Sequence, residues 1–182
     1  MQPGEVAADI YGGVGVFGLF MGAAGAQVTL VEIEPGAVAA AQTTAAAWGI
    51  TDLTCLAASA ADAITTLPVL DLALVDPPRT GLDEFTTTAL CDDGPPRLIY
   101  VSCSPITFAR DAARLVRSGY VMDTYELYDF YPQTVHIEGL ARFTRTDAAR
   151  EQHRERRAAE AAAEVEAAAA LAAGAGAGAI VD

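Results

Sequence analysis

Cysteine is scarce in this sequence, which has three among 182 residues: Cys55, Cys91 and Cys103. Their wide spacing gives neither a disulfide framework nor a CxxC metal-binding pattern. No uninterrupted apolar run reaches the ~18 residues of a membrane-spanning helix, although alanine raises the hydrophobic content to 52%. The residues after Met1 lack the basic and apolar regions of a secretory signal. We therefore expect a cytoplasmic protein with reduced cysteines, no membrane contact and no bound metal. We also expect a monomer.

Positive charge is sparse as well, because 11 lysines and arginines face 24 acidic residues and leave a net charge of −13. Proteins bind phosphate backbones through lysine and arginine, so this chain alone would hold an RNA substrate weakly. Two explanations stay open: a basic module is missing, or the acidity is concentrated away from the site.

Short apolar or β-branched segments alternate with helical segments over the first two thirds of the chain. The run at 70–75 is apolar apart from Asp71, as in strands buried on both faces of a parallel sheet. The last two strands leave no room for a helix between them and are predicted to be antiparallel. The pattern predicts an α/β fold with a doubly wound, mostly parallel sheet. We expect strands at 5–10, 27–32, 53–57, 70–75, 97–102, 121–128 and 135–144, and helices at 17–24, 35–48 and 105–118.

The composition changes near Asp147, where charged residues give way to alanine and glutamate and then to a Gly/Ala repeat. Such a segment has little with which to form a core. We expect a single domain over residues 1–146. We expect residues 147–182 to be a tail that is partly helical or disordered.

A glycine-rich turn, DIYGGVGVF at Asp9–Phe17, lies between the first expected strand and helix. Glycines there allow a ligand to approach the backbone, and a helix amino end favours negative charge. Tight strand–helix turns need glycine anyway, so the turn alone is weak support for a ligand site. Glu32 ends the second strand, where an acid commonly binds ribose hydroxyls. Glu34 is the competing candidate, and a solvated strand end is the alternative.

The segment Asp76–Gly81, DPPRTG, follows the apolar strand at 70–75. Two prolines cannot continue a strand, so they force a rigid exit at the sheet edge where ligands bind. Asp76 would project from that edge with Arg79 nearby. The alternative is a stiff loop with a surface ion pair.

Cys103 stands at the end of another buried strand, directly before a helix that begins with Pro105. The helix amino end favours a thiolate, and cysteine is the strongest nucleophile among side chains at neutral pH. A lone cysteine is by default a small buried hydrophobe, but Ser102 and Ser104 are unusual neighbours for that role. Cys55 and Cys91 are interpreted as structural.

His136 and Glu138 are the remaining candidates. If they belong to a strand, their side chains point to one face and could meet a common ligand. An ordinary polar strand face is the alternative.

Together, DPPRTG (76–81), YVSCSPITFARD (100–111) and FYPQTVHIE (130–138) resemble the RNA (uracil-5-)-methyltransferases. These are class I S-adenosylmethionine-dependent enzymes, and the resemblance covers roughly residues 3–145. It implies a Rossmann-like methyltransferase fold, S-adenosyl-L-methionine as cofactor, and tRNA or rRNA as substrate. Members with an iron–sulfur cluster carry its cysteines in an amino-terminal region absent from this chain.

The resemblance also implies roles for individual residues. Cys103 would be the nucleophile that adds to carbon 6 of uracil, which makes carbon 5 nucleophilic enough to accept a methyl group. Glu138 would then remove the proton from carbon 5. By the same resemblance, Tyr11, Gly13, Glu32 and Asp76 would bind the cofactor, with a contact to the bound uracil as the alternative role for Tyr11, Glu32 or Asp76.

The sequence departs from the family pattern at several positions. Where the family often has cysteine, asparagine, asparagine, an acid and asparagine, this chain has Gly12, Thr44, Trp48, Ser59 and Ser104. The family's upstream RNA-binding parts, including a glutamine that helps to hold the cofactor, are expected to be missing.

Three alternatives remain beside a uracil-5 methyltransferase. An amino-nitrogen methyltransferase needs no cysteine, but Arg79 stands where such enzymes commonly have an aromatic residue. A cysteine hydrolase would use Cys103, His136 and Glu138, and would leave the glycine turn unexplained. A catalytically impaired fragment or remnant would keep the fold and lack its RNA-binding region.

Overall fold

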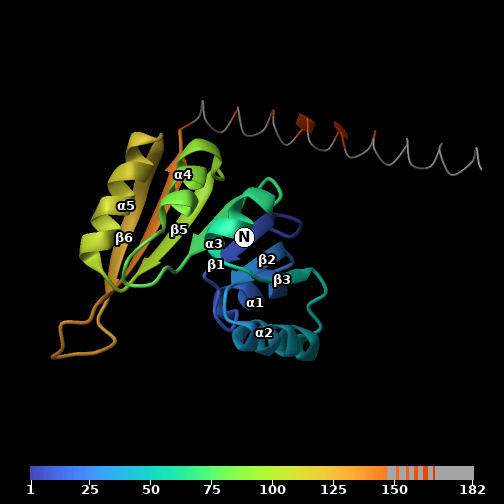
Figure 1. Cartoon of the computed structure of the whole chain (residues 1–182), viewed down its shortest axis with the longest axis horizontal. Coiled ribbons are helices and arrows are strands. Elements are labelled where there is room, and N and C mark those ends of the chain that lie inside the picture. Colours follow the sequence, from blue (N-terminus) through green and yellow to red (C-terminus); the bar gives the residue numbers. More distant parts are fainter. Residues whose placement is uncertain (147–150, 152–154, 156–157, 160–161, 164–165, 167–182) are drawn as a thin grey trace, which may run out of the picture. The chain divides into compact units, whose positions relative to one another are not determined.

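The computed structural model describes residues 1–146 together with residues 151, 155, 158–159, 162–163 and 166. Residues Met1–Thr146 form one compact unit. Its centre is a seven-stranded sheet in the order β3-β2-β1-β4-β5-β7-β6 (Figure 1). The strands are β1 (Val6–Ile10), β2 (Gln27–Glu32), β3 (Leu53–Ala57), β4 (Leu72–Val75), β5 (Arg97–Ser102), β6 (Tyr120–Tyr128) and β7 (Glu138–Arg145).

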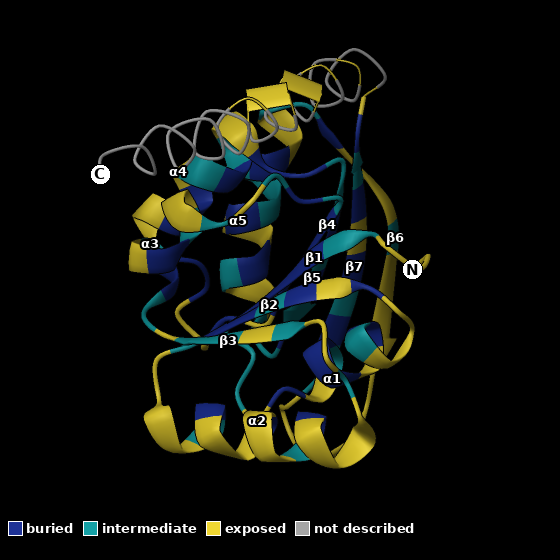
Figure 2. Cartoon of the chain, turned by 90° about the vertical axis from the view of Figure 1, so that its right-hand side faces the viewer, coloured by how far each residue is buried: buried dark blue, intermediate teal, exposed yellow. Residues whose placement is uncertain are grey.

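Helices cover both faces of the sheet, as Figure 2 shows. Two helices pack on one face, and three pack on the other, where a short 3₁₀ helix at Ile64–Thr66 follows the first of the three. On the first face lie α1 (Val16–Ala23) and α2 (Pro35–Trp48), and on the second lie α3 (Ala60–Ala63), α4 (Glu84–Asp93) and α5 (Pro105–Arg117).

The core has two halves because side chains alternate between the faces of a strand. Ala7 of β1 and Leu74 of β4 belong to a buried cluster with Met21 of α1. The next residue of β1, Ala8, belongs to a second cluster with Leu90 of α4. Both clusters need apolar residues, so β4 is apolar throughout and β1 is apolar except for the buried Asp9.

The chain order reverses at β1. The strands run outward from β1 to β2 and β3, and the chain then returns to place β4 on the other side of β1. β1 pairs in parallel with both β2 and β4. In open α/β sheets, ligands bind outside the carboxyl ends of the strands at such a reversal. The glycine-rich turn and Asp76 both lie at this place.

β7 is inserted between β5 and β6 and runs antiparallel to both. The predicted fold class is confirmed: the sheet is mostly parallel, and its last strand is antiparallel. No helix in the described part of the chain is long and apolar enough to cross a membrane.

The predicted strand at 135–144 begins too early, since β7 starts at Glu138. A turn occupies the preceding residues: the Thr134 N–H and hydroxyl both donate to the Tyr131 carbonyl, and Gln133 has a positive φ of 68°. His136 therefore lies in a loop. The hypothesis that His136 and Glu138 share one face of a strand is wrong.

Two helices were not predicted, α3 and α4. The sequence of α4, EFTTTALCDD, is rich in threonine and aspartate, which are weak helix formers. Its helix is set by its amino end, where the Asp83 carboxylate accepts a hydrogen bond from the Thr86 N–H at 2.9 Å. An aspartate followed by threonine three residues later was a usable capping signal.

Residues Asp147–Asp182 form a second unit. The seven described residues of this unit are helical. The predicted Gly/Ala-rich part of the tail lies outside the described residues.

Candidate active site

The glycine-rich turn after β1 lies beside the end of β2. The Gly13 N–H donates to Glu32 Oε2 at 2.9 Å, and the Glu34 N–H donates to Glu32 Oε1 at 2.8 Å. Two backbone donors thus fix the Glu32 carboxylate and leave a second lone pair on each oxygen. Gly13 has a φ of 54°, and a Cβ there would meet no atom within 4 Å. The space next to the turn is therefore open to a ligand.

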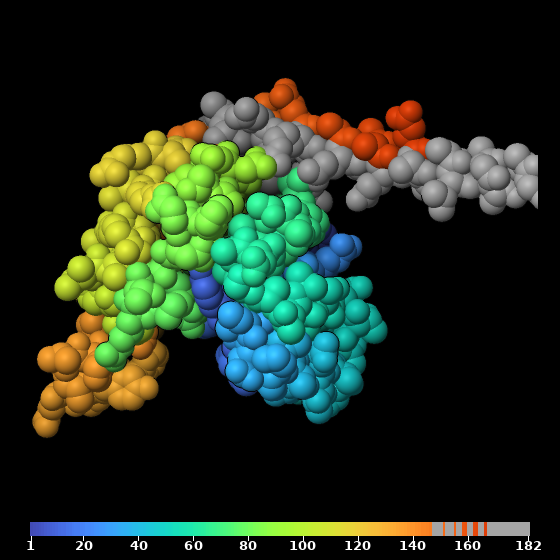
Figure 3. Space-filling view, in the orientation of Figure 1, coloured from blue at the N-terminus to red at the C-terminus, as the bar shows by residue number. Residues whose placement is uncertain are grey.

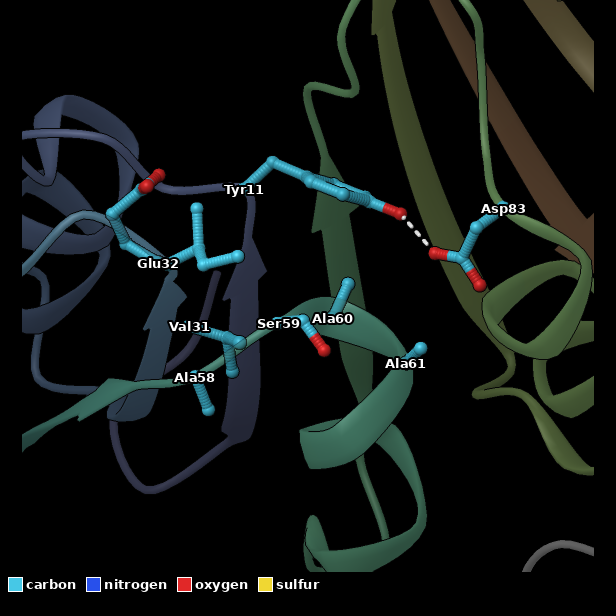
Figure 4. A pocket seen from close by; sticks show the side chains of 9 residues that line it. Tyr11, Val31, Glu32, Ala58, Ser59, Ala60, Ala61 and Asp83 are labelled. Carbon is cyan, nitrogen blue, oxygen red and sulfur yellow. Dashed lines mark hydrogen bonds between the residues drawn. The ribbon is translucent and has the colours of Figure 1, made fainter.

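A cavity of about 230 Å³ lies beside Glu32. Its walls are mostly apolar, and Figure 4 shows side chains from the ends of β1 and β2 and from the start of α3 around it. Such a lining suits a flat apolar ring with a polar group at one end. The cavity is lined by Tyr11, Val31, Glu32, Ile33, Ala58, Ser59, Ala60, Ala61 and Asp83.

Tyr11 spans this cavity. Its hydroxyl donates to Asp83 Oδ2 at 2.8 Å, which links the end of β1 to the residue before α4 (Figure 4). Its backbone is left-handed, with a φ of 64°, which is costly for an aromatic residue. Burial raises the pKa of Tyr11 to about 12, so the hydroxyl stays protonated at neutral pH and acts as the donor.

Asp83 was not singled out from the sequence. Partial burial alone would raise the pKa of Asp83. Hydrogen bonds from Thr86 and Tyr11 outweigh this effect and hold the pKa of Asp83 below its ordinary value. Its partnership with Tyr11 joins residues 72 positions apart in the chain. Only the capping pattern at the start of α4 pointed to Asp83.

Asp9 of β1, the first residue of the glycine-rich segment, has no solvent exposure. Its Oδ2 accepts a hydrogen bond from the Gly18 N–H at 2.7 Å, whereas Oδ1 has no partner among the described residues. Burial, together with the nearby charges of Asp76 and Glu32, raises its pKa to about 6. A buried carboxyl group with a raised pKa therefore binds the backbone at the start of α1, directly after the turn.

A second cavity, of about 450 Å³, brings together three of the predicted residues: Asp76, Cys103 and Glu138. Asp76 follows β4, and Cys103 follows β5. Since β7 is antiparallel, its first residues meet the carboxyl end of β5. The remaining lining residues are Phe17, Val101, Tyr128, Phe130, Gly139 and Leu140.

The strand register explains why Cys103 and Glu138 lie on one cavity. Ser102 of β5 is paired directly with Gly139 of β7. Cys103, which follows β5, and Glu138, the first residue of β7, are therefore neighbours at the sheet edge. Figure 3 shows that the surface is hollowed between the blue-to-teal residues and the green residues, with residues of the earliest part of the chain at its floor.

The negative charge of Glu138 acts on the carboxyl group of Asp76. Asp76 is an exposed residue. Desolvation of its carboxyl group, followed by the negative charge of Glu138, nevertheless raises the pKa of Asp76 above its ordinary value. A hydrogen-bond donor on a bound ligand would stabilise the charged form of Asp76.

Arg79 forms no ion pair with these carboxylates within the described part of the chain and has His136 as its side-chain partner. Its Nη2 lies 2.9 Å from His136 Nδ1, and neither residue lines the cavity of Cys103. The structure therefore separates His136 from Cys103 and Glu138. This arrangement gives no support to a Cys–His pair.

A buried carboxylate holds the DPPRTG segment in place. Asp111 of α5 accepts hydrogen bonds from the Leu82 N–H, the Tyr100 hydroxyl and Arg110 Nε, at 2.9, 2.8 and 2.8 Å. Arg110 also donates to the carbonyls of Thr80 and Leu82. Residues of the YVSCSPITFARD segment thus fix the loop that carries Asp76.

Among the residues that the structure describes, no group of three or more His, Cys, Asp and Glu side chains could hold a metal ion. The sheet order with its antiparallel β7, the glycine-rich turn after β1 and the acid at the end of β2 define a Rossmann-like methyltransferase fold. The model of the tRNA (Uracil-5-)-methyltransferase family matches residues 4–145, and the chain belongs to this family.

Relatives and solved structures agree with this assignment. The chain is 36% identical over 152 residues to the Uncharacterized RNA methyltransferase YljE of Lactococcus lactis, covering 80% of this chain and 32% of the relative. It is 38% identical over 145 residues to the 23S rRNA (uracil(1939)-C(5))-methyltransferase RlmD of a Shewanella strain, covering 78% and 32%. The chain thus spans about a third of the length of these relatives.

A solved structure with the same fold is the Pyrococcus abyssi tRNA (uracil-54, C5)-methyltransferase in complex with S-adenosyl-L-homocysteine. It matches with a TM-score of 0.70 and 32% identity, covering 79% of this chain and 35% of that one. A precorrin-6y C5,15-methyltransferase from Geobacter metallireducens has a TM-score of 0.65 at 13% identity, which reflects the fold alone.

Proposed function

We propose that this chain is the catalytic domain of an enzyme that transfers a methyl group from S-adenosylmethionine to carbon 5 of a uridine in RNA. The observation that carries the proposal is the convergence of Asp76, Cys103 and Glu138 on one cavity. Phe17, in the first turn of α1, also lines this cavity, so the helix that follows the glycine-rich turn borders it. We further propose residues 1–146 as the domain and residues 147–182 as a separate tail.

The cavity beside Glu32 fits the adenosine part of the cofactor. The slot between the end of β2 and the start of α3 is apolar enough for a purine ring, and the fixed Glu32 carboxylate can accept hydrogen bonds from ribose hydroxyls. The open space above Gly13 leaves room for the remainder of the molecule. When bound, S-adenosylmethionine supplies the electrophilic methyl group.

Cys103 begins the reaction. Its thiolate adds to carbon 6 of the uracil ring, and the electron pair of the ring double bond moves to carbon 5 and the adjacent carbonyl. Carbon 5 then attacks the methyl carbon, and the electron pair of the sulfonium bond leaves with sulfur. Neither step needs a metal ion, because the thiolate provides the activation.

Glu138 ends the reaction. Its carboxylate removes the proton from carbon 5, the ring double bond reforms and the Cys103 thiolate leaves carbon 6. Asp76 holds the ring in place, either by accepting from the ring N–H as a carboxylate or by donating to a carbonyl when protonated. Desolvation, followed by the charge of Glu138, raises the pKa of Asp76 above its ordinary value.

The test is a covalent trap. The chain is incubated with S-adenosylmethionine and an RNA that contains 5-fluorouridine, and the products are separated on a denaturing gel. Fluorine at carbon 5 cannot leave as a proton does, so the adduct should persist. Cys103→Ser should abolish the adduct, whereas Cys55→Ser is the matched control and should retain it.

Two results would contradict the proposal. If the unmodified chain forms no adduct, it has the fold and not the activity, as expected of a fragment or remnant that lacks its RNA-binding region. If the adduct survives in Cys103→Ser, another side chain is the nucleophile.

A further inference from the structure

The loop between β6 and β7 carries aromatic side chains beside the cavity of Cys103. Figure 1 shows this loop, in orange, extending beyond the end of the sheet. Tyr128 and Phe130 line the cavity, yet Phe130 is 66% exposed and Tyr131 is 56% exposed. Large exposed aromatic rings at the mouth of a cavity are unusual, since burial would stabilise them.

Tyr128 and Phe130 form a defined pair. Their rings are nearly parallel, with an interplanar angle of 10° and centroids 5.7 Å apart. The Tyr128 hydroxyl donates to Glu126 Oε2 at 2.6 Å, which holds the ring in place. The spacing lies within the range of a direct offset stack, so no third ring fits between them. We call this pair the aromatic platform, and its free face is the outer face of Phe130.

We propose that the aromatic platform stacks against the base of an unpaired RNA nucleotide adjacent to the target uridine. This inference rests on the proposed function. A uridine whose ring enters the cavity must leave its own base stack, which uncovers the face of a neighbouring base. Aromatic side chains stack on such bases in single-stranded RNA, and they tolerate any sequence because every base has a π-face.

The local charges favour stacking over contacts with phosphate. The carboxylates of Asp76 and Glu138 lie in the cavity, and those of Glu126 and Asp129 flank the platform. Arg79, paired with His136, is the basic group that the structure places on the adjoining DPPRTG loop. A site with this balance gains little from releasing counterions, so we expect binding to depend weakly on salt, with a slope of log affinity against log salt of about −0.7 for one phosphate contact.

The test uses a short single-stranded RNA with one uridine and 2-aminopurine as its neighbour, on the 5′ side in one oligonucleotide and on the 3′ side in another. Fluorescence of 2-aminopurine falls when the base stacks. The unmodified chain is titrated without S-adenosylmethionine, so no methyl transfer occurs. We expect quenching with at least one oligonucleotide, and binding about tenfold weaker for Phe130→Ala.

Two variants serve as matched controls. Phe130→Tyr keeps the ring and should bind like the unmodified chain. Phe85→Ala removes a ring that is 76% exposed on α4, away from the cavity, and should also bind like the unmodified chain. Loss of binding in Phe130→Ala with both controls intact supports the platform.

The fluorouridine adduct is measured in parallel to separate the two proposals. No quenching by the unmodified chain, or equal quenching by Phe130→Ala, overturns the platform, and adduct formation would then leave the methyl transfer standing. Quenching that depends on Phe130 without any adduct overturns the methyl transfer alone. Quenching would then report an RNA-binding surface.

Discussion

Asp76 and Glu138 interact although their strands, β4 and β7, are separated in the sheet by β5. The two residues line one cavity because β7 runs opposite to its neighbour and brings its first residue to the edge where β4 and β5 end. Desolvation and the charge of Glu138 both raise the pKa of Asp76. Removing the charge of Glu138 should therefore change the titration of Asp76.

The first prediction concerns Glu138→Gln and the pH dependence of adduct formation. Without the charge of Glu138, the pKa of Asp76 should fall, and any limb of the pH profile that reports Asp76 should move to lower pH. The measurement is the rate of fluorouridine adduct formation between pH 4 and 8. An unmoved profile in Glu138→Gln would show that Asp76 does not control this step.

The second prediction concerns release from the adduct. With ordinary uridine RNA, Glu138→Gln should accumulate a methylated covalent complex, because no base removes the proton from carbon 5. Free methylated RNA should fall at least 100-fold, in the range typical of a lost general base. Denaturing gels and labelled methyl groups measure both species. Glu84→Gln, which breaks an exposed ion pair with Arg114, is the control and should release product normally.

The third prediction separates Glu32 from Glu34 as the cofactor acid. Glu32→Gln should weaken S-adenosylhomocysteine binding by about tenfold to a hundredfold, because a charged acceptor for the ribose hydroxyls is lost. Calorimetric titration measures this directly. Glu34→Gln alters only the start of α2, where Glu34 accepts from the Gly36 N–H, and should bind normally. The reverse result would assign the ribose contact to Glu34.

The fourth prediction concerns Asp9 and stability. Its pKa rises from 3.8 to about 6 in the folded chain. A raised pKa favours the folded state below pH 3.8, and this contribution is lost as the pH rises through about 6. The unmodified chain should thus lose about 3 kcal/mol of unfolding free energy across this window relative to Asp9→Asn.

Urea unfolding of both proteins at several pH values between 3 and 8 measures this difference. Because other acids titrate in the same range, the informative quantity is the difference between the two proteins. A difference that stays constant with pH would mean that Asp9 titrates alike in the folded and unfolded chains.

The fifth prediction concerns the buried Asp111. Asp111→Ala leaves three donors, from Leu82, Tyr100 and Arg110, without their acceptor. Unfolding free energy should fall by about 3–5 kcal/mol, as when one member of a buried charged network is removed. Asp92→Ala, on the exposed side of α4, should change it by less than about 0.5 kcal/mol. Comparable losses in both would argue against a special role of Asp111.

The sequence predicts elements best where the local signals agree. The helix at Pro35–Trp48 has the bounds expected from its proline at the start and Gly49 at its end, where φ is 69°. The strands at Gln27–Glu32 and Arg97–Ser102 also match, because apolar and β-branched residues fill their interiors. α4 was missed because its residues are weak helix formers and its stability comes from packing and from one capping aspartate.

For the candidate site as well, the sequence predicts the features that have local signals and misses those that depend on tertiary contacts. Asp76 and Cys103 each follow a strand that the sequence marks, so their location at one edge could be anticipated. Glu138 was expected inside a strand at 135–144, and the start of β7 at this residue was not predicted. The contact of Tyr11 with Asp83 and the pairing of Arg79 with His136 could not, since both depend on how loops far apart in the sequence fold against each other.

The placement of β7 also has a consequence for biosynthesis. A ribosome delivers β5 and β6 before β7, and β7 must then enter between them to complete the sheet. Until it does, the edge of β5 is unpaired and can associate with other chains. Cys103 is therefore present before its proposed base. A nascent chain that stopped short of Glu138 would hold the proposed nucleophile without the proposed base that releases it from the ring.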